Sequence, residues 1–337
     1  MSEFPGISVL LPVYFPMLSA SAVGLLRRAL ESVQEQRYRG PLEIVLVDDG
    51  SPTAVESLSH ELGAAAAPVR WVRLTRNSGI VAALNAGIAA ARYELIARLD
   101  ADDRWLPGKL ERQVALFQAD PDLSIVGTGM VRVTAEGDEI DRHIRPADWT
   151  RLLRFFVEGG CPFPHGSVVA RRDIYRLLGG YPYDATFRHC EDYALWGTWL
   201  RFFKATMIEE ALYEYRVSSL SVSVQHAAQQ SAASSIIRNR FAALDLSDVL
   251  PHALVALARA LGVPMLDAGR LAYMVWQNPA GGFGVPKEAL APLAAILPDR
   301  VLLPTDHAPA WWTALSGTAV PRADPTDLEG IAAKPYR

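Results

Sequence analysis

The sequence predicts an α/β protein whose central sheet is mostly parallel and Rossmann-like, with helices on both faces. Short runs of Val, Ile and Leu alternate with helical patterns from residue 7 to residue 99, and these runs are continuously apolar. Continuous apolar strands between helices are typical of parallel sheets that are buried on both faces. In addition, 50% of the 337 residues are hydrophobic, which is enough to fill a large core.

The first part of the chain contains four strand–helix units in sequence. The apolar runs predict strands at residues 7–13, 43–47, 69–74 and 94–99. The apolar spacing between them predicts helices at residues 21–36, 54–62 and 79–92.

After Pro107 the pattern is less regular. We expect helices at 107–120, 148–159, 172–180 and 191–203, strands at 123–133, 166–170 and 205–217, and a polar turn at 135–139. From about residue 225 the chain is predicted to be mostly helical, before a Pro-rich tail at 321–330. These changes predict a nucleotide-binding and catalytic domain over residues 1–220 and a mostly helical C-terminal region over 221–337, which packs on the first domain or stands alone.

Composition excludes several classes of protein. The formal net charge is −4 with no long basic block, so no nucleic-acid partner is expected. Two cysteines are too few for a disulfide framework or a thiolate zinc site, which indicates a reducing cytoplasm. Neither a signal peptide nor an apolar run of membrane-spanning length is recognisable. We therefore expect a cytoplasmic protein that is soluble or at most peripheral to a membrane.

Polar residues follow each of the first four predicted strands. In an open parallel sheet, ligands bind beyond the carboxyl ends of the strands, so these residues should line one edge. They are Pro12, Val13 and Tyr14 after the first strand, Asp48 to Ser51 after the second, Arg76 and Asn77 after the third, and Asp100, Asp102 and Asp103 after the fourth.

The three carboxylates after the fourth strand indicate a cation site. Asp100, Asp102 and Asp103 repel one another unless they are protonated or bind a cation. Hard oxygen ligands favour Mg²⁺ or Mn²⁺, and a nucleotide diphosphate would supply the remaining oxygens. The alternative is that Asp102 and Asp103 only cap the helix that begins near Pro107.

The second and third strand ends are less specific. Asp-Gly pairs such as Asp49-Gly50 are common in solvated turns, but a carboxylate there could also accept a hydrogen bond from a nucleobase. Arg76 is either a ligand of phosphate or base, or an ordinary surface charge.

Six segments in this order resemble the family 2 glycosyltransferases, which have the GT-A fold. The segments are VLLPVYF, EIVLVDDGS, NSGIVAALNAGI, LDADD, GGYP and CEDYALW. The resemblance covers about residues 6–217 and leaves out the helical C-terminal third.

The resemblance implies a donor site, a metal ion and a general base. Enzymes of this family transfer a sugar from a nucleotide diphosphate, here most simply a UDP-sugar, to an acceptor hydroxyl with inversion. Asp102 would bind Mn²⁺ or Mg²⁺, Asp100 would bind the ribose, and Asp192 would be the general base. The residues implied to lie around the base and the diphosphate are Pro12, Val13, Tyr14, Asp49, Arg76 and Asn77.

Four further residues are candidates for the acceptor or sugar side: Asp103, His165, Glu191 and Trp196. Each has an ordinary alternative. Asp103 could cap a helix, Glu191 could be favoured by a helix N-terminus, His165 could be a hydrogen-bonded loop residue, and Trp196 is more often a core residue.

The chain departs from the family pattern at three places. Phe15 stands where the family usually has Asn, and Thr53 stands where it commonly has Asp. Many members carry a metal-binding histidine directly after a Tyr-Arg pair, whereas this chain has Ser218 beyond Tyr215, Arg216 and Val217. His226 is the candidate to replace it; otherwise Asp102, the diphosphate and water would hold the metal.

Three interpretations compete. The first is an inverting, metal-dependent glycosyltransferase in bacterial surface polysaccharide or glycolipid synthesis, with a saccharide or lipid-linked acceptor. The second is a degenerate module that binds nucleotide without turnover. The third, a Mg²⁺-dependent phosphotransferase, is disfavoured because its nucleophilic Asp normally follows the first strand. For RLLRFFVEG, a helix packed on its own core is favoured over a peripheral contact with the inner face of the membrane.

Overall fold

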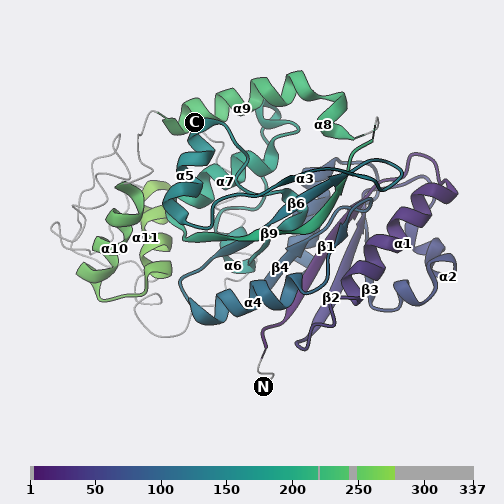
Figure 1. The fold of residues 1–337 in the computed structure, drawn as a ribbon, viewed down its shortest axis with the longest axis horizontal. Coiled ribbons are helices and arrows are strands. Elements are labelled where there is room, and N and C mark those ends of the chain that lie inside the picture. Colours follow the sequence, from purple (N-terminus) through teal and green to yellow (C-terminus); the bar gives the residue numbers. More distant parts are fainter. Residues whose placement is uncertain (1–3, 219–220, 243–248, 278–337) are drawn as a thin grey trace.

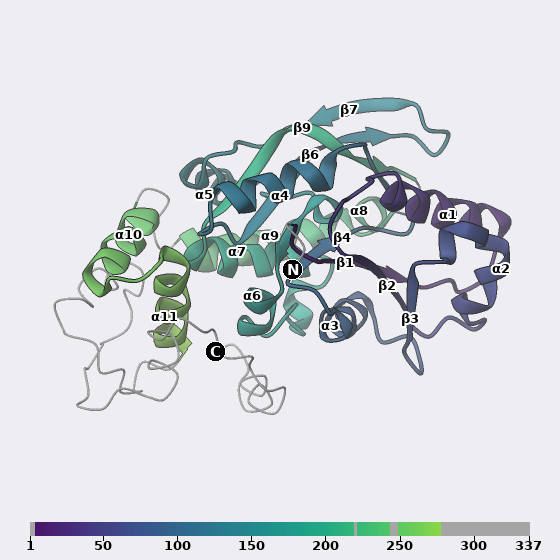
Figure 2. The ribbon, with the colours of Figure 1, turned by 90° about the horizontal axis from the view of Figure 1, so that it is seen from below.

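The computed structural model describes residues 4–218, 221–242 and 249–277. Within these residues a nine-stranded sheet runs through the middle of the molecule, with helices on both sides (Figures 1 and 2). The strand order is β3-β2-β1-β4-β8-β6-β9-β5, and β7 pairs with β6. The predicted α/β class with a helix-covered central sheet is confirmed.

The first half of the sheet is parallel, as the apolar runs predict. It consists of β1 (Ile7–Val13), β2 (Leu42–Asp48), β3 (Val69–Arg73) and β4 (Leu95–Arg98). Strand β1 pairs with both β2 and β4, and β2 pairs with β3. All four strands point the same way, so their carboxyl ends meet at one edge of the sheet.

The second half of the sheet is mixed. It contains β5 (Arg104–Trp105), β6 (Ile125–Val133), β7 (Glu139–His143), β8 (Val169–Arg171) and β9 (Ala205–Arg216). Strand β8 is antiparallel to β4 and β6, whereas β9 is parallel to β6. Strand β9 also pairs with β5, which brings its end back to the loop after β4.

Helices of both halves cover the two faces of the sheet. Alternate residues of β2 show this: Val45 and Val47 belong to the hydrophobic cluster under α3, α6 and α7, whereas Ile44 and Leu46 belong to the cluster under α1 and α4. Burying each such side chain contributes about 1.5–3 kcal/mol. The helices on these faces are α1 (Ala20–Gln34), α2 (Ser59–Leu62), α3 (Ile80–Ala90), α4 (Lys109–Ala119), α5 (Trp149–Glu158), α6 (Arg172–Leu177) and α7 (Glu191–Phe202).

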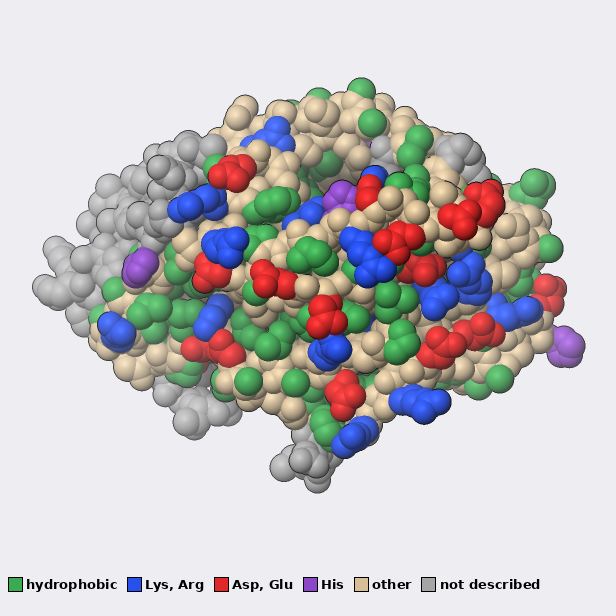
Figure 3. All heavy atoms as spheres, viewed as in Figure 1, with side chains coloured by type: hydrophobic (Ala, Val, Ile, Leu, Met, Phe, Trp, Pro, Cys, Tyr) green, Lys and Arg blue, Asp and Glu red, His purple; other side chains and the backbone are tan. Residues whose placement is uncertain are grey.

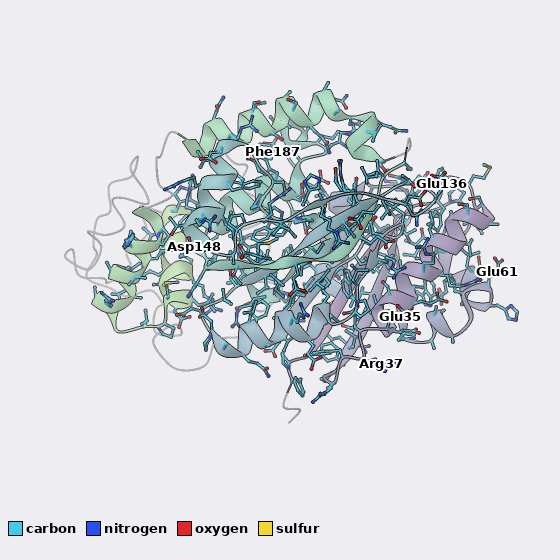
Figure 4. All side chains as sticks on the ribbon, in the orientation of Figure 1. Glu35, Arg37, Glu61, Glu136, Asp148 and Phe187 are labelled. Atoms are coloured by element: carbon cyan, nitrogen blue, oxygen red, sulfur yellow. The ribbon has the colours of Figure 1, made fainter. Side chains whose placement is uncertain are left out.

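The C-terminal helices pack on the sheet-bearing part. They are α8 (Val222–Gln225), α9 (Ala227–Ala242), α10 (Val249–Leu261) and α11 (Met265–Gln277). Ile237, Leu257 and Leu271 are buried in the same hydrophobic cluster as α3 and α7, and Phe187 lies beneath α9 (Figure 4). The boundary near residue 220 stays a prediction, and the Pro-rich tail lies outside the described residues.

Helix α5 packs on the core of the protein. Its cap Asp148 (Figure 4) accepts a hydrogen bond from the Arg151 backbone N–H at 2.9 Å. Leu152, Leu153 and Phe156 of this helix are fully buried. This position supports the core interpretation of RLLRFFVEG.

The described surface and helices also bear on possible partners. Acidic and basic side chains lie interspersed on the face drawn in Figure 3. In the part of the chain that the structure describes, we find no helix with the length and hydropathy needed to cross a bilayer.

Candidate active site

The turn after β2 is built on two adjacent carboxylates with different partners. Asp48 accepts hydrogen bonds from the backbone N–H groups of Ser51 at 2.8 Å and Val55 at 3.0 Å, which closes the turn. Asp49 accepts from the N–H groups of Ser78 and Gly79, both at 2.8 Å. Gly79 is the N-cap of α3, so Asp49 joins the β2 turn to the start of that helix. Burial raises the pKa of Asp49, and these two hydrogen bonds oppose the shift.

The loop after β3 lies directly against this turn. Gly50 has a φ of +68°, and a Cβ there would lie 2.2 Å from the carbonyl carbon of Arg76 and 2.6 Å from the backbone N of Asn77. Only glycine allows so close an approach of two backbones. The side chains of Arg76 and Asn77 are exposed at this junction.

The end of β1 is tied to the same turn. The hydroxyl of Ser51 accepts a hydrogen bond from the Phe15 N–H at 3.0 Å, and the Asp49 N–H donates to the Val13 carbonyl at 2.9 Å. Pro12 and Val13 are buried, whereas Tyr14 is 39% exposed. The structure therefore places the residues predicted around the nucleotide, other than Asp100, in one cluster of loops.

The loop after β4 carries the other carboxylates, and Arg98 lies beneath it. Arg98 is 3% exposed and forms an ion pair with Asp100 through Nη1. Burial, the largest single effect, lowers the pKa of Arg98, but the charge and hydrogen bond of Asp100 together with Tyr213 and Tyr181 outweigh it, so the net shift is upward and the guanidinium stays charged. The Tyr213 hydroxyl also lies 3.5 Å from Asp100. Asp100 is thereby held on its protein side by a fixed cation.

Asp102 and Asp103 have opposite surroundings. Asp103 is 3% exposed and accepts hydrogen bonds from the Tyr213 hydroxyl and, at 2.7 Å, from the Arg216 N–H. Its position favours a structural role, joining this loop to β9, over the predicted contact with the sugar. Asp102 keeps an exposed face, and burial of the remainder together with the charge of Asp100 raises the pKa of its carboxyl to about 6.

The Asp102 carboxylate is suited to be one ligand of a metal ion whose remaining ligands come from a bound molecule. Among the described residues, no group of three or more His, Cys, Asp or Glu side chains could hold a metal ion. The crowding of negative charge that raises the pKa of Asp102 is nevertheless what a cation would relieve. His226 stacks on His189 with ring centroids 4.0 Å apart, and its Nδ1 lies 2.6 Å from Gln229 Oε1. In this arrangement His226 is engaged by protein partners.

The first turn of α7 contributes two further carboxylates. Burial raises the pKa of Asp192 to about 6, while the Tyr193 N–H at 2.8 Å and the positive charge of Arg98 oppose the shift. Burial, followed by the charge of Asp192, raises the pKa of Glu191 to about 7. A carboxylate with a pKa near neutrality is suited to accept a proton at physiological pH.

His165 and Trp196 lie behind this helix end. His165 Nε2 is 2.8 Å from the Tyr181 hydroxyl, and burial lowers the pKa of His165 well below its usual value, so the ring is neutral. Trp196 is fully buried, with its ring centroid 6.3 Å from that of His165. The core interpretation of Trp196 fits this placement, whereas His165 lies at the border of the site.

Sequence reasoning missed two residues that organise the site. Arg98 is the one basic residue of the predicted strand at 94–99, between Ala97 and Leu99, and this position among apolar neighbours was the available signal. Asn85 of α3 donates to the Tyr181 carbonyl at 3.0 Å and accepts from the Tyr181 N–H at 2.8 Å. No local pattern could reveal the role of Asn85, because its partner Tyr181 is 96 residues away in the sequence.

Comparisons with known proteins agree with the fold. Residues 8–179 match the family model described as Glycosyl transferase family 2. The Bacillus subtilis protein EpsE, named as a glycosyltransferase, is 31% identical over 229 residues, which cover 65% of this chain and 76% of EpsE. The amylovoran biosynthesis glycosyltransferase AmsE of Erwinia amylovora is 30% identical over 171 residues, which cover 51% of this chain and 62% of AmsE. The alignment with AmsE thus spans less than two thirds of that relative.

A solved structure shows the same architecture. The mannosyltransferase PcManGT of Pyrobaculum calidifontis, in complex with GDP-Man and Mn²⁺, superposes with a TM-score of 0.53 at 20% identity. The superposition covers 87% of this chain and 79% of that protein. The likeness confirms the predicted fold class.

Proposed function

The chain belongs to the family 2 glycosyltransferases, and on that premise we propose that it moves a sugar from a nucleotide diphosphate sugar to an acceptor hydroxyl with inversion. We favour a UDP-sugar as the donor. The observation that carries the proposal is that the loops after β1, β2 and β3 are joined by the hydrogen bonds of Asp49 and Ser51, at the sheet edge where β4 ends in Asp100 and Asp102.

The donor would bind across the carboxyl ends of β1 to β4. Tyr14 has an exposed ring, and Arg76 and Asn77 are exposed on a loop fixed by Gly50, so these side chains are free to meet base and diphosphate. Asp100, which Arg98 holds by an ion pair, is the proposed ligand of the ribose hydroxyls. Asp49 would contact the base from within its hydrogen-bonded turn.

Asp102 is the proposed protein ligand of Mn²⁺ or Mg²⁺, with donor oxygens and water in the remaining positions. A divalent ion there would neutralise the charge that develops on the departing nucleoside diphosphate. Mn²⁺ in the structure of PcManGT is consistent with this proposal.

The transfer would be a single displacement. The acceptor oxygen attacks the anomeric carbon while the bond from that carbon to the diphosphate oxygen breaks, and the acceptor proton passes to Asp192. Glu191, the neighbour of Asp192 in α7, and the neutral His165, which lies against Tyr181 and Trp196, are the proposed hydrogen-bonding partners of the acceptor. No covalent sugar–enzyme intermediate is expected, unlike the double displacement of retaining glycosidases.

The names of two relatives support a biological setting. AmsE is named for amylovoran biosynthesis, and a further relative, WbnJ of Escherichia coli, is named for O-antigen biosynthesis. We propose that this chain likewise extends a surface polysaccharide or glycolipid, on a saccharide or lipid-linked acceptor at the inner face of the membrane.

A screen of donors tests the proposal. Purified protein with Mn²⁺ is incubated with UDP-, GDP-, CDP- and dTDP-sugars and a panel of saccharide acceptors, and release of nucleoside diphosphate is measured. The expected result is turnover of donors with one base and a product of inverted anomeric configuration by NMR. Tight nucleotide binding without turnover of any donor would favour the degenerate module, and a retained configuration would refute the single displacement.

A further inference from the structure

The loop that carries His165 is held by side chains of two other elements. The Gly166 carbonyl accepts a hydrogen bond from the indole N–H of Trp105 in β5 at 2.8 Å. The Ser167 carbonyl accepts one from Nε2 of Gln113 in α4 at 2.9 Å. Trp105, Gln113 and Ser167 are fully buried, and a hydrogen bond in such surroundings is stronger than one in water. The two residues that follow His165 are therefore fixed from outside their own loop.

Gly166 is held from a second direction by Tyr213, the register partner of Trp105 in the β5–β9 pair. A Cβ on Gly166 would lie 2.5 Å from the ring atom Cζ of Tyr213, which is buried. The hydroxyl of the same ring donates to Asp103 and lies 3.5 Å from Asp100. The Gly166 backbone thus packs directly on a residue that is bound to the carboxylate loop after β4.

Lys109 orients the side chain of Gln113. Its Nζ, fully buried in the first turn of α4, donates to Gln113 Oε1 at 2.8 Å and lies 4.1 Å from the ring centroid of Trp105. Nε2 of Gln113 then faces the carbonyl of Val126 at 2.6 Å as well as that of Ser167. The reverse orientation would turn Oε1 toward two carbonyl oxygens, which cannot donate. Lys109 therefore contacts both of the side chains that hydrogen-bond the loop.

The contacts of Lys109 explain its place better than its charge does. Neither Gln113 nor Trp105 is an anion, and burial lowers the pKa of Lys109 well below its usual value. An ammonium that is buried without a paired anion lowers stability. The amine donates to Gln113 Oε1 whether it is protonated or neutral, so the orientation of Gln113 is the same in both states.

We propose that Trp105, Lys109 and Gln113 are positioning residues for the transfer, which hold His165 at a set distance from the Asp102 carboxylate. Trp105 lies three residues after Asp102 in the chain and is hydrogen-bonded to the residue after His165. This inference rests on the proposed function, in which Asp102 binds the metal and His165 the acceptor. The three residues need not touch either substrate, because they act by setting the spacing between the donor side and the acceptor side.

Three substitutions should release the loop in different ways. Trp105→Phe removes the indole N–H and keeps an aromatic ring beside Lys109. Gln113→Glu keeps the size of the side chain and an oxygen for Lys109, but a carboxylate cannot donate to the Ser167 carbonyl. Lys109→Met removes the donor that orients Gln113 and introduces no charge.

Trp149→Phe is the matched control for Trp105→Phe. Trp149 is also buried, and its indole N–H donates to a backbone carbonyl, that of Leu200, at 3.1 Å. Both variants should lower the urea midpoint, because each loses a buried hydrogen bond. Only Trp105→Phe should change the surroundings of His165.

The His165 ring is observed by NMR in protein with ¹³C-labelled histidine, which needs no turnover. The chain has 7 histidines, and His165→Gln assigns the signal. We expect one sharp signal in the wild type and in Trp149→Phe, and a broadened or split signal in the three loop variants. With an active donor, kcat/KM for the acceptor should fall about 10–10²-fold in the loop variants. Nucleoside diphosphate affinity should stay that of the wild type, because the loops after β1 to β3 are unchanged.

The outcomes are distinct. A sharp and unshifted His165 signal in folded Trp105→Phe and Gln113→Glu would overturn the inference, and so would an equal change in Trp149→Phe. A changed signal with an unchanged kcat/KM for the acceptor would overturn the positioning role. If one of these variants does not fold, Lys109→Met and the remaining variant decide by the same criteria. If no donor is turned over at all, the proposed function fails, and the NMR signal still decides whether these residues hold His165.

Discussion

Replacement of Gly50 by alanine tests whether the β2 turn must touch the β3 loop. The added Cβ would lie 2.2 Å from the carbonyl carbon and 2.5 Å from the Cα of Arg76, both of them backbone atoms that cannot rotate away. The φ of +68° alone costs a residue with a side chain about 1–2 kcal/mol. Forcing the two loops apart adds about 1–3 kcal/mol. Gly50→Ala should therefore destabilise the protein by about 2–5 kcal/mol and weaken nucleotide binding.

Gly262→Ala is the matched control. Gly262 has a similar φ of +65°, but nothing lies within 4 Å of its added Cβ. It should show the backbone cost of about 1–2 kcal/mol without the contact cost. Urea denaturation and titration with nucleoside diphosphates measure the two effects. Gly50→Ala should be less stable than Gly262→Ala if the reasoning holds. Equal stability, together with nucleotide binding like that of the wild type, would show that the contact between the two loops is not required for either property.

Three further predictions follow from individual side chains. Asp192→Asn should bind donor and lose about 10²–10⁴-fold in transfer, and near-normal transfer would remove Asp192 from the role of base. Burial raises the pKa of Asp192 to about 6 in the folded state, so the free energy of unfolding falls as pH rises from about 4 to about 6. Asp192→Asn has no such ionisation and should therefore be more stable than the wild type at pH 7, by up to about 3 kcal/mol. In the wild type, kcat should fall about tenfold per pH unit below about pH 6, where the base is protonated; a flat profile down to pH 5 would contradict this. Asn85→Ala leaves the Tyr181 backbone groups unpaired and should cost about 1–3 kcal/mol by urea denaturation, and a loss below 0.5 kcal/mol would show that water replaces the side chain.

The elements that could be predicted from the sequence are those with a strong local pattern. The four parallel strands are continuous apolar runs, and each one is present. The predicted helix at 54–62 is instead a 3₁₀ turn over Val55–Leu58 followed by the short α2; the buried residues Val55, Leu58 and Leu62 keep the helical spacing that led to the prediction. Strands β5 and β7 were missed, since β5 has two residues and β7 reads EIDRH without an apolar pattern.

The site could be predicted only as far as its position in the sheet. Parallel strand ends meet at one edge by geometry, which is why the loops after β1 to β4 lie together. Which carboxylate is structural and which is available to a ligand depends on residues far away in the sequence. Asp103 is occupied by Tyr213 and Arg216, more than a hundred positions away, whereas Asp102 keeps an exposed face. The sequence alone cannot tell which of two neighbouring aspartates has a structural role.

Metal-dependent nucleotide binding tests the central claim most directly. Wild type, Asp102→Ala and the control Asp120→Ala are titrated calorimetrically with UDP, GDP, CDP and dTDP, each with Mn²⁺ and with EDTA. The control removes a carboxylate outside the site, which pairs with Lys204 and accepts a hydrogen bond from the Asp122 N–H. The account predicts that the wild type and the control bind diphosphates of one base far more tightly with Mn²⁺, and that Asp102→Ala loses this dependence. Equal binding in Mn²⁺ and EDTA, or a metal dependence that survives in Asp102→Ala, would contradict it.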